Sequence, residues 1–136
     1  MSSRNNEVTT IRSDLDIVTA RSVARDVAKV QGFGAVDQAR IATAVSELAR
    51  NIFLYASTGT VTSRPVERNG RKGIEIVCED QGPGIDSIDQ VMQDGYTTSR
   101  GMGMGLPGAK RLMDDFEIES KTGVGTKITC RKWRSR

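Results

Sequence analysis

The sequence predicts an α+β fold: a two-layer α/β sandwich in which helices cover one face of a mixed, mainly antiparallel sheet. Apolar residues recur at helical spacing in two long segments of the N-terminal half. Two later segments alternate apolar and polar residues around turn signals, which indicates β-hairpins. The length of 136 residues suits one domain with its own core. We therefore expect residues 1–136 to form one unit, with a loose tail at 1–6.

Two helices are expected after a weakly alternating segment, residues 7–12, that predicts a short edge strand. A capping pattern at Ser13–Asp16 begins the first helix, and Gly32 ends it. The second helix begins near Asp37 and runs to about Ala56. The apolar stripes are formed by Ile17, Ala20, Ala24, Val27 and Ala28 in the first helix and by Ile41, Val45, Leu48, Ile52 and Tyr55 in the second.

The second half of the chain predicts two hairpins separated by short helices. Residues 60–80 form the first hairpin around Asn69-Gly70, and Pro65 favours an edge position or a bulge. Short helices are expected at 87–92 and at 106–114, the latter with Pro107 in its first turn. Residues 116–133 form the second hairpin, which turns at 122–125.

Composition narrows the classes of function. The net charge of +3 is mild and the chain has few aromatic residues, so we expect no nucleic-acid partner. The chain has no histidine, which excludes a His-based triad, a His-rich metal site and phosphoryl storage on its own histidine. Cys78 and Cys130 lack metal-site spacing and indicate a reducing, cytoplasmic setting. No apolar run is long enough to span a membrane, so no membrane partner is expected.

Glu47 and Asn51 lie four residues apart and share one face of the second helix, beside its apolar stripe. An amide oxygen is a hard ligand that suits Mg²⁺. A carboxylate can orient or deprotonate a nucleophile. Taken alone, the pair is better explained by a hydrogen bond on the helix surface, which is the commoner arrangement.

Residues 79–108 contain seven glycines, which fall into two groups. Asp80 follows a strand and precedes Gly82 and Gly84. Its carboxylate can accept a hydrogen bond from an exocyclic amine, although a plain tight turn fits as well. The second group, Gly101, Gly103 and Gly105, precedes a helix and can bind an anion through backbone N–H groups. The alternative for the second group is a mobile linker.

Four weak signals in a fixed order are more specific than any one of them. These signals resemble the N, G1, G2 and G3 boxes of the GHKL (Bergerat-fold) ATPases and kinases. Residues 16–56, 79–85 and 105–116 closely resemble the RsbT-type switch serine/threonine kinases of the bacterial stressosome. The matching positions are Glu47-x-x-x-Asn51, Asp80-x-Gly82-x-Gly84, Gly101-x-Gly103-x-Gly105-Leu106 and Gly125-Thr126.

The resemblance implies that ATP and Mg²⁺ bind between the helices and the sheet, under a lid formed by the second glycine group. Glu47 would act as base or orienting group for the attacking hydroxyl, and Asn51 would hold Mg²⁺. Asp80 would bind the adenine amine, with Thr126 helping through water. The remaining nucleotide contacts would come from Gly82, Gly84, Ile85, Gly101, Gly103, Gly105 and Leu106. Arg100 departs from the smaller residue expected there, and we give it no catalytic role.

The resemblance also implies partners. The substrates would be Ser or Thr residues of STAS-domain proteins of the RsbS and RsbR type. After release from that scaffold, the kinase would activate a PP2C-type phosphatase of the RsbU type. The alternatives are an anti-sigma-factor-like protein that binds a sigma factor in an ATP-dependent way, and a nucleotide-binding protein without useful catalysis. The presence of Glu47 argues against the last of these.

Overall fold

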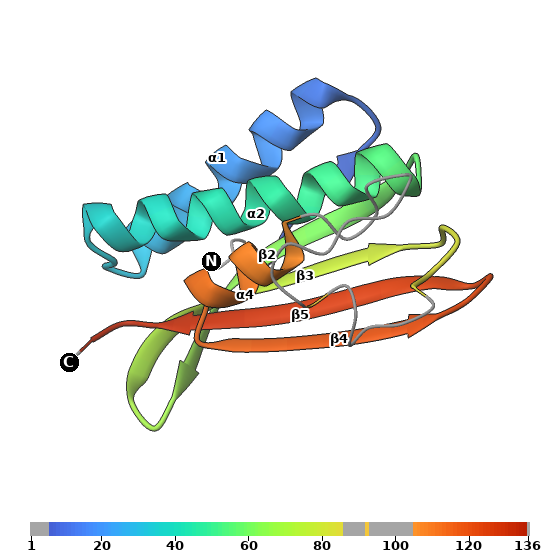
Figure 1. Cartoon of the computed structure of the whole chain (residues 1–136). Coiled ribbons are helices and arrows are strands. Elements are labelled where there is room, and N and C mark those ends of the chain that lie inside the picture. Colours follow the sequence, from blue (N-terminus) through green and yellow to red (C-terminus); the bar gives the residue numbers. More distant parts are fainter. Residues whose placement is uncertain (1–5, 86–91, 93–104, 136) are drawn as a thin grey trace.

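A computed structural model of the chain describes residues 6–85, 92 and 105–135. The described strands form one five-stranded sheet, and the described helices lie on one of its faces (Figure 1). The predicted two-layer α+β class is confirmed. In chain order the elements are β1 (Glu7–Ile11), α1 (Asp14–Val30), α2 (Ala35–Tyr55), β2 (Gly59–Arg68), β3 (Arg71–Asp80), α4 (Leu106–Leu112), β4 (Asp115–Lys121) and β5 (Gly125–Trp133).

The ends of α1 follow from its local sequence. The Ser13 side chain accepts a hydrogen bond from the backbone N–H of Asp16 at the start of the helix. At the other end, Gly32 has a φ of 92°, and the N–H of Phe33 donates to the carbonyl of Ala28. This is the Schellman arrangement, which turns the chain sharply toward α2. The predicted beginning and end of the first helix are therefore confirmed.

The sheet order is β1-β2-β3-β5-β4, and each of these strand pairs is antiparallel. The mixed character that we expected is therefore not seen among the described strands. Asn69 and Gly70 both have positive φ, as the two-residue turn between β2 and β3 requires. The β2–β3 register runs without a bulge, and Pro65 lies where β2 extends beyond β1. Pro65 thus occupies a local edge, where a missing N–H is tolerated.

The core lies between the helices and the covered face of the sheet. Four of the five stripe residues of α2 are buried, and Tyr55 is partly exposed. Both cysteines are free and buried. None of the described helices is long and apolar enough to cross a membrane. The buried stripe residues of α2 are Ile41, Val45, Leu48 and Ile52, and they share one core with Ile74, Ile76, Cys78, Ile128 and Cys130 of the sheet.

Two expected helices differ from the structure or lie beyond it. The helix expected at 87–92 falls outside the described residues except for Met92, which lies in a turn. The helix expected at 106–114 is confirmed but ends at Leu112. It ends there because Met113 is extended and the N–H of Asp114 already donates to the carbonyl of Arg131 in β5.

The uncovered face of the sheet carries one buried carboxylate. Glu75 is only 5% exposed, and its two oxygens lie 2.6 Å from Nε of Arg64 and 2.8 Å from Nε of Arg131. Burial alone would raise the pKa of Glu75, but the hydrogen bonds from the two arginines outweigh it and lower the pKa below 4.5. The carboxylate thus joins β2, β3 and β5 across the open face.

We expect Glu75→Gln to destabilise the fold by about 3 kcal/mol at neutral pH, because it leaves two guanidinium groups without their charge partner. A lowered pKa means that this stabilisation is present above the ordinary pKa and is lost as pH falls through the lowered one. Urea unfolding at neutral and acidic pH measures the effect. A difference from wild type that does not shrink in acid would contradict this account.

Candidate active site

A pocket lies between the C-terminal half of α2, the end of β3, the start of β5 and the start of α4. Six of the residues predicted for nucleotide or metal binding line it, namely Asn51, Asp80, Gly84, Ile85, Leu106 and Thr126. Its other walls are largely apolar. These walls are Leu48, Ile52, Tyr55, Ala56, Cys78, Pro83 and Ile128. Burial raises the pKa of the Cys78 thiol well above its ordinary value, so this wall is uncharged.

Asp80 is the last residue of β3 and lines the pocket. The backbone N–H of Gly82 donates to Oδ1 of Asp80 at 2.8 Å. Burial raises the pKa of Asp80, although the backbone N–H groups of Gly82 and Thr126 act in the opposite direction. Asp80 is therefore a fixed acceptor in a partly dry setting, which suits recognition of an amine in a flat ring.

The turn after Asp80 rests on the hairpin between β4 and β5. The carbonyl of Pro83 accepts a hydrogen bond from the N–H of Gly123 at 2.8 Å. The N–H of Ile85 donates to Oγ of Ser120, also at 2.8 Å. Gly84 lies against the backbone of Lys121. These contacts place Gly84 and Ile85 at the pocket wall.

Thr126 lies directly opposite Asp80 in the pairing of β3 and β5. Its hydroxyl, however, lies 2.9 Å from Oγ of Ser120 rather than on Asp80. Position 125, just before Thr126, requires glycine, because a Cβ there would clash with the carbonyl oxygen of Asp80. Ser120 thus links the turn after Asp80 to β5, a role that sequence reasoning missed.

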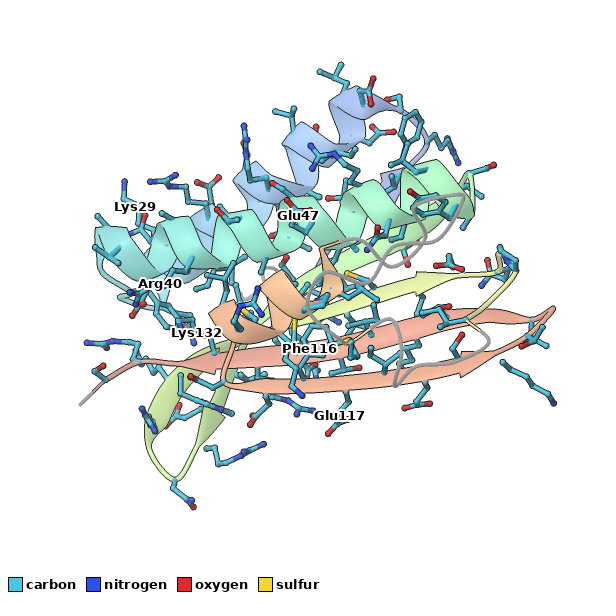
Figure 2. The ribbon with its side chains drawn as sticks, viewed as in Figure 1. Lys29, Arg40, Glu47, Phe116, Glu117 and Lys132 are labelled. Atoms are coloured by element: carbon cyan, nitrogen blue, oxygen red, sulfur yellow. The ribbon has the colours of Figure 1, made fainter. Side chains whose placement is uncertain are left out.

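Asn51 and Glu47 lie on neighbouring turns of α2 and face different surroundings. The Asn51 amide nitrogen is buried and is the one buried side-chain polar atom without a hydrogen-bond partner in the described part of the chain. The surface hydrogen bond between Glu47 and Asn51 is therefore not formed. Glu47 lies midway along α2 (Figure 2), 37% exposed and 3.7 Å from Arg50. Arg50 is exposed.

Gly105 brings the start of α4 onto Glu47. Its φ is 87°, and a Cβ there would lie 2.5 Å from Oε1 of Glu47. A glycine is thus required both by the backbone and by the side chain opposite. Leu106, the next residue, is 1% exposed and forms part of the pocket wall. Gly101, Gly103 and Arg100 lie outside the described residues, whereas Gly82 lies against Ala56 at the end of α2.

The sequence and the fold agree with those of a known protein family. Residues 11–132 match the model of the histidine kinase-like ATPase domain. The chain belongs to the histidine kinase-like ATPase domain family. The catalytic domain of the histidine kinase ThkA, solved in a nucleotide-free form, has the same fold, with a TM-score of 0.57 at 12% identity over 96% of this chain and 99% of that one.

Two curated proteins are similar to the chain over most of its length. The serine/threonine-protein kinase RsbT of Bacillus subtilis (strain 168) is 57% identical over 123 residues, which cover 90% of this chain and 92% of RsbT. The anti-sigma F factor of Caldanaerobacter subterraneus subsp. tengcongensis is 34% identical over 104 residues, 72% of this chain and 71% of that protein. The predicted resemblance to RsbT-type protein kinases is confirmed, and the ATPase family implies that the chain uses ATP.

Proposed function

We propose that this protein kinase transfers the γ-phosphate of ATP to Ser or Thr of STAS-domain proteins of the RsbS and RsbR type, in the cytoplasm. Once released from them, it would activate a PP2C-type phosphatase of the RsbU type. The observation that carries the proposal is that Asp80 and Asn51 line one pocket, while Glu47 lies against Gly105, the residue before the pocket-lining Leu106. The 57% identity with the serine/threonine-protein kinase RsbT supports Ser or Thr as the residue that accepts the phosphate.

The two ends of the pocket suit the two ends of ATP. Asp80 would accept a hydrogen bond from the adenine amine, and the apolar walls would enclose the ring. Gly82, Gly84, Ile85 and Thr126 would hold this end in place. At the end of the pocket nearer to Glu47, Gly105 and Leu106 would contact the nucleotide. Gly101 and Gly103 would contact the phosphates.

The side chains fit a magnesium ion held partly by phosphate oxygens. The Asn51 amide is buried without a partner for its nitrogen, and rotation of the amide by 180° presents its oxygen instead. No group of three or more His, Cys, Asp or Glu residues forms a metal cluster among the described residues. This agrees with Mg²⁺, which commonly takes one or two protein ligands and completes its shell with phosphate and water. When bound, Mg²⁺ would neutralise phosphate charge.

Glu47 would receive the proton of the attacking hydroxyl. The carboxylate is partly exposed, so a Ser or Thr of a partner can approach it from solvent. As the hydroxyl oxygen forms its bond to the γ-phosphorus, the bond between that phosphorus and the bridging oxygen breaks, and ADP leaves. Glu47 thereby holds the hydroxyl in line and accepts its proton.

The test is transfer of labelled γ-phosphate to purified STAS-domain proteins. We expect labelled Ser or Thr, a requirement for Mg²⁺, and competition between the STAS protein and an RsbU-type phosphatase for the kinase. Unlabelled STAS proteins under conditions in which the chain binds ATP would contradict the proposed substrate class. Pull-down from the native host, followed by mass spectrometry, identifies the cognate partners.

The second candidate is an ATP-dependent anti-sigma factor, which the 34% identity to an anti-sigma F factor favours. In that case the chain would sequester a sigma factor, and phosphorylation would be secondary. Tight binding to a sigma factor without transfer to any STAS protein would favour this alternative. Binding to the phosphatase but to no sigma factor would exclude it.

Gly105→Ala tests the contact between α4 and Glu47. The added methyl meets Glu47, and the positive φ strains any residue with a Cβ, by about 1–2 kcal/mol. We expect a modest loss of stability and a larger fall in the transfer rate, because the carboxylate must move. Gly108→Ala in the same helix is the control, since nothing lies within 4 Å of its added methyl. That variant should be as active as wild type, and equal activity of both variants would contradict the contact.

A further inference from the structure

We propose that Lys132 is a positioning residue for the nucleotide site, acting through α4. It lies near the end of β5, at the opposite end of α4 from Gly105. The inference rests on the proposed function, because it assumes that the pocket beside α4 takes ATP. It adds a residue that lines no part of that pocket and belongs to none of the four sequence boxes.

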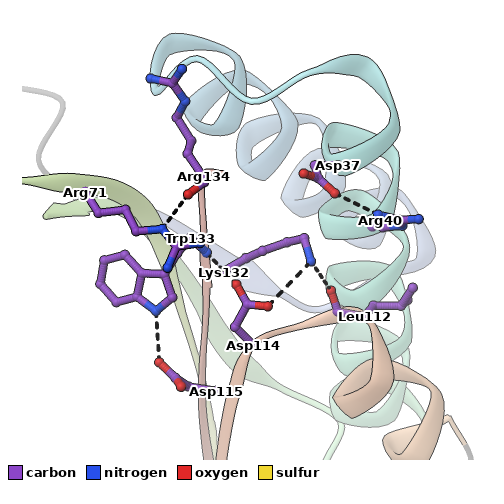
Figure 3. A network of polar contacts seen from close by, with 9 residues as sticks. All are labelled: Asp37, Arg40, Arg71, Leu112, Asp114, Asp115, Lys132, Trp133 and Arg134. Carbon is purple, nitrogen blue, oxygen red and sulfur yellow. Dashed lines mark hydrogen bonds and ion pairs between the residues drawn. The ribbon is translucent and has the colours of Figure 1, made fainter. Parts of the chain in front are cut away.

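Lys132 holds the C-terminal end of α4. Its ammonium donates a hydrogen bond to the carbonyl of Leu112, the last residue of the helix, at 3.0 Å. A carboxylate oxygen of Asp114 lies 4.0 Å from the same ammonium, and the Lys132 side chain is only 12% exposed. Figure 3 shows Lys132 reaching across from β5 to both residues. A cation at this position satisfies a helix carbonyl that has no partner within the helix and complements the helix dipole.

The chain just after α4 is fastened to the same stretch of β5. The N–H of Asp114 donates to the carbonyl of Arg131 at 2.8 Å. In return, Oδ2 of Asp114 accepts from the N–H of Trp133, also at 2.8 Å (Figure 3). Together with Lys132, these bonds fix the end of α4 to β5. Because β5 pairs with β3, they relate α4 to the strand that carries Asp80.

The other end of α4 forms the functional contacts. Gly105 abuts Glu47, and the buried Leu106 lines the pocket. The helix has seven residues, about 10 Å of rise, and so short a helix has no stability of its own. Its position is therefore set by its contacts with α2 and by the fastening at its end. Loss of the Lys132 contact should shift or fray α4, and Leu106 and Gly105 would move with it.

Lys132→Met tests this inference, because methionine keeps an unbranched apolar side chain but lacks the ammonium. We expect faster hydrogen exchange of the α4 amides and an affinity for a non-hydrolysable ATP analogue with Mg²⁺ about tenfold weaker, the size of one hydrogen bond to a charged group. Lys132→Arg should restore part of the affinity. Lys127→Met, at an exposed position of the same strand, is the control and should bind as wild type does. A thermal melt of each variant separates loss of the fold from loss of the site.

Two results would overturn the inference. One is a Lys132→Met protein that binds the analogue as tightly as wild type; the other is an equal loss of affinity in Lys127→Met. Should Lys132→Met not fold, Asp114→Ala cuts the Trp133 link at the same end of α4 and carries the same expectations. A wild-type chain that binds no ATP analogue would overturn the proposed function and this inference with it. Equal binding by wild type and Lys132→Met overturns the inference alone.

Discussion

Replacement of Glu47 by Gln is expected to lower the rate of phosphoryl transfer by about a hundred- to ten-thousandfold, the contribution usual for a general base. Glutamine has the same shape but cannot take up the proton of the attacking hydroxyl. Nucleotide affinity should change little, because Glu47 lies beside Gly105 and does not line the pocket around Asp80. Single-turnover transfer to a STAS protein and calorimetric titration with ATP measure the two quantities separately.

Asp37→Asn is the matched control for Glu47→Gln. Asp37 lies on the same helix, and its carboxylate is paired with Arg40 at 3.0 Å, away from the pocket. The control should transfer phosphate at the wild-type rate. A Glu47→Gln protein that retains that rate as well would remove Glu47 from the chemistry. A parallel loss of ATP affinity would instead assign Glu47 to binding.

Asp80→Asn is expected to weaken ATP binding by about ten- to a hundredfold. Oδ1 of Asp80 accepts from the N–H of Gly82, and under the proposed function the second carboxylate oxygen would accept from the adenine amine. In asparagine the second position carries an NH₂ group, so two donors would face each other. Titration with ATP and with a nucleotide that lacks the amine measures the effect. The loss should be largest for ATP.

The same substitution should raise the stability of the nucleotide-free protein at neutral pH. Burial raises the pKa of Asp80, so its ionised form is disfavoured in the folded state. This cost in folding free energy is present above the raised pKa of Asp80 and disappears as pH falls through that pKa. ATP affinity should decline over the same pH range, because the protonated carboxyl is a poorer acceptor. Glu79→Gln removes a charge from the exposed neighbouring residue and should alter neither property strongly. A less stable Asp80→Asn protein with unchanged affinity would contradict both expectations.

The sequence could predict those features that local physics determines. The helix stripes, the Ser13 cap, the Gly32 termination and the Asn69-Gly70 turn each depend on residues close together in the chain, and the structure confirms them. That the site binds a nucleotide was predicted from several motifs together. No single motif was decisive, but the order of four weak motifs was specific.

Features that depend on contacts between elements far apart in the chain could not be predicted. Ser120 was overlooked because nothing in a plain alternating strand marks one hydroxyl as the link between a loop and β5. Lys132 stands next to Arg131 in the sequence, and nothing local marks it as the residue whose ammonium contacts the end of α4. The requirement for glycine at Gly105 could be suspected from the motif, but its cause, the carboxylate of Glu47, lies 58 positions earlier in the chain.

The position of β5 has a consequence for how the chain is made. This strand is the last of those described, yet it lies inside the sheet, between β3 and β4. A nascent chain therefore exposes an unpaired edge of β3 until β5 has left the ribosome, and the contacts around Asp80 close only then. We infer that ribosome-bound chains arrested before Gly125 are prone to aggregate, and that ATP can speed none of the folding steps that precede the insertion of β5.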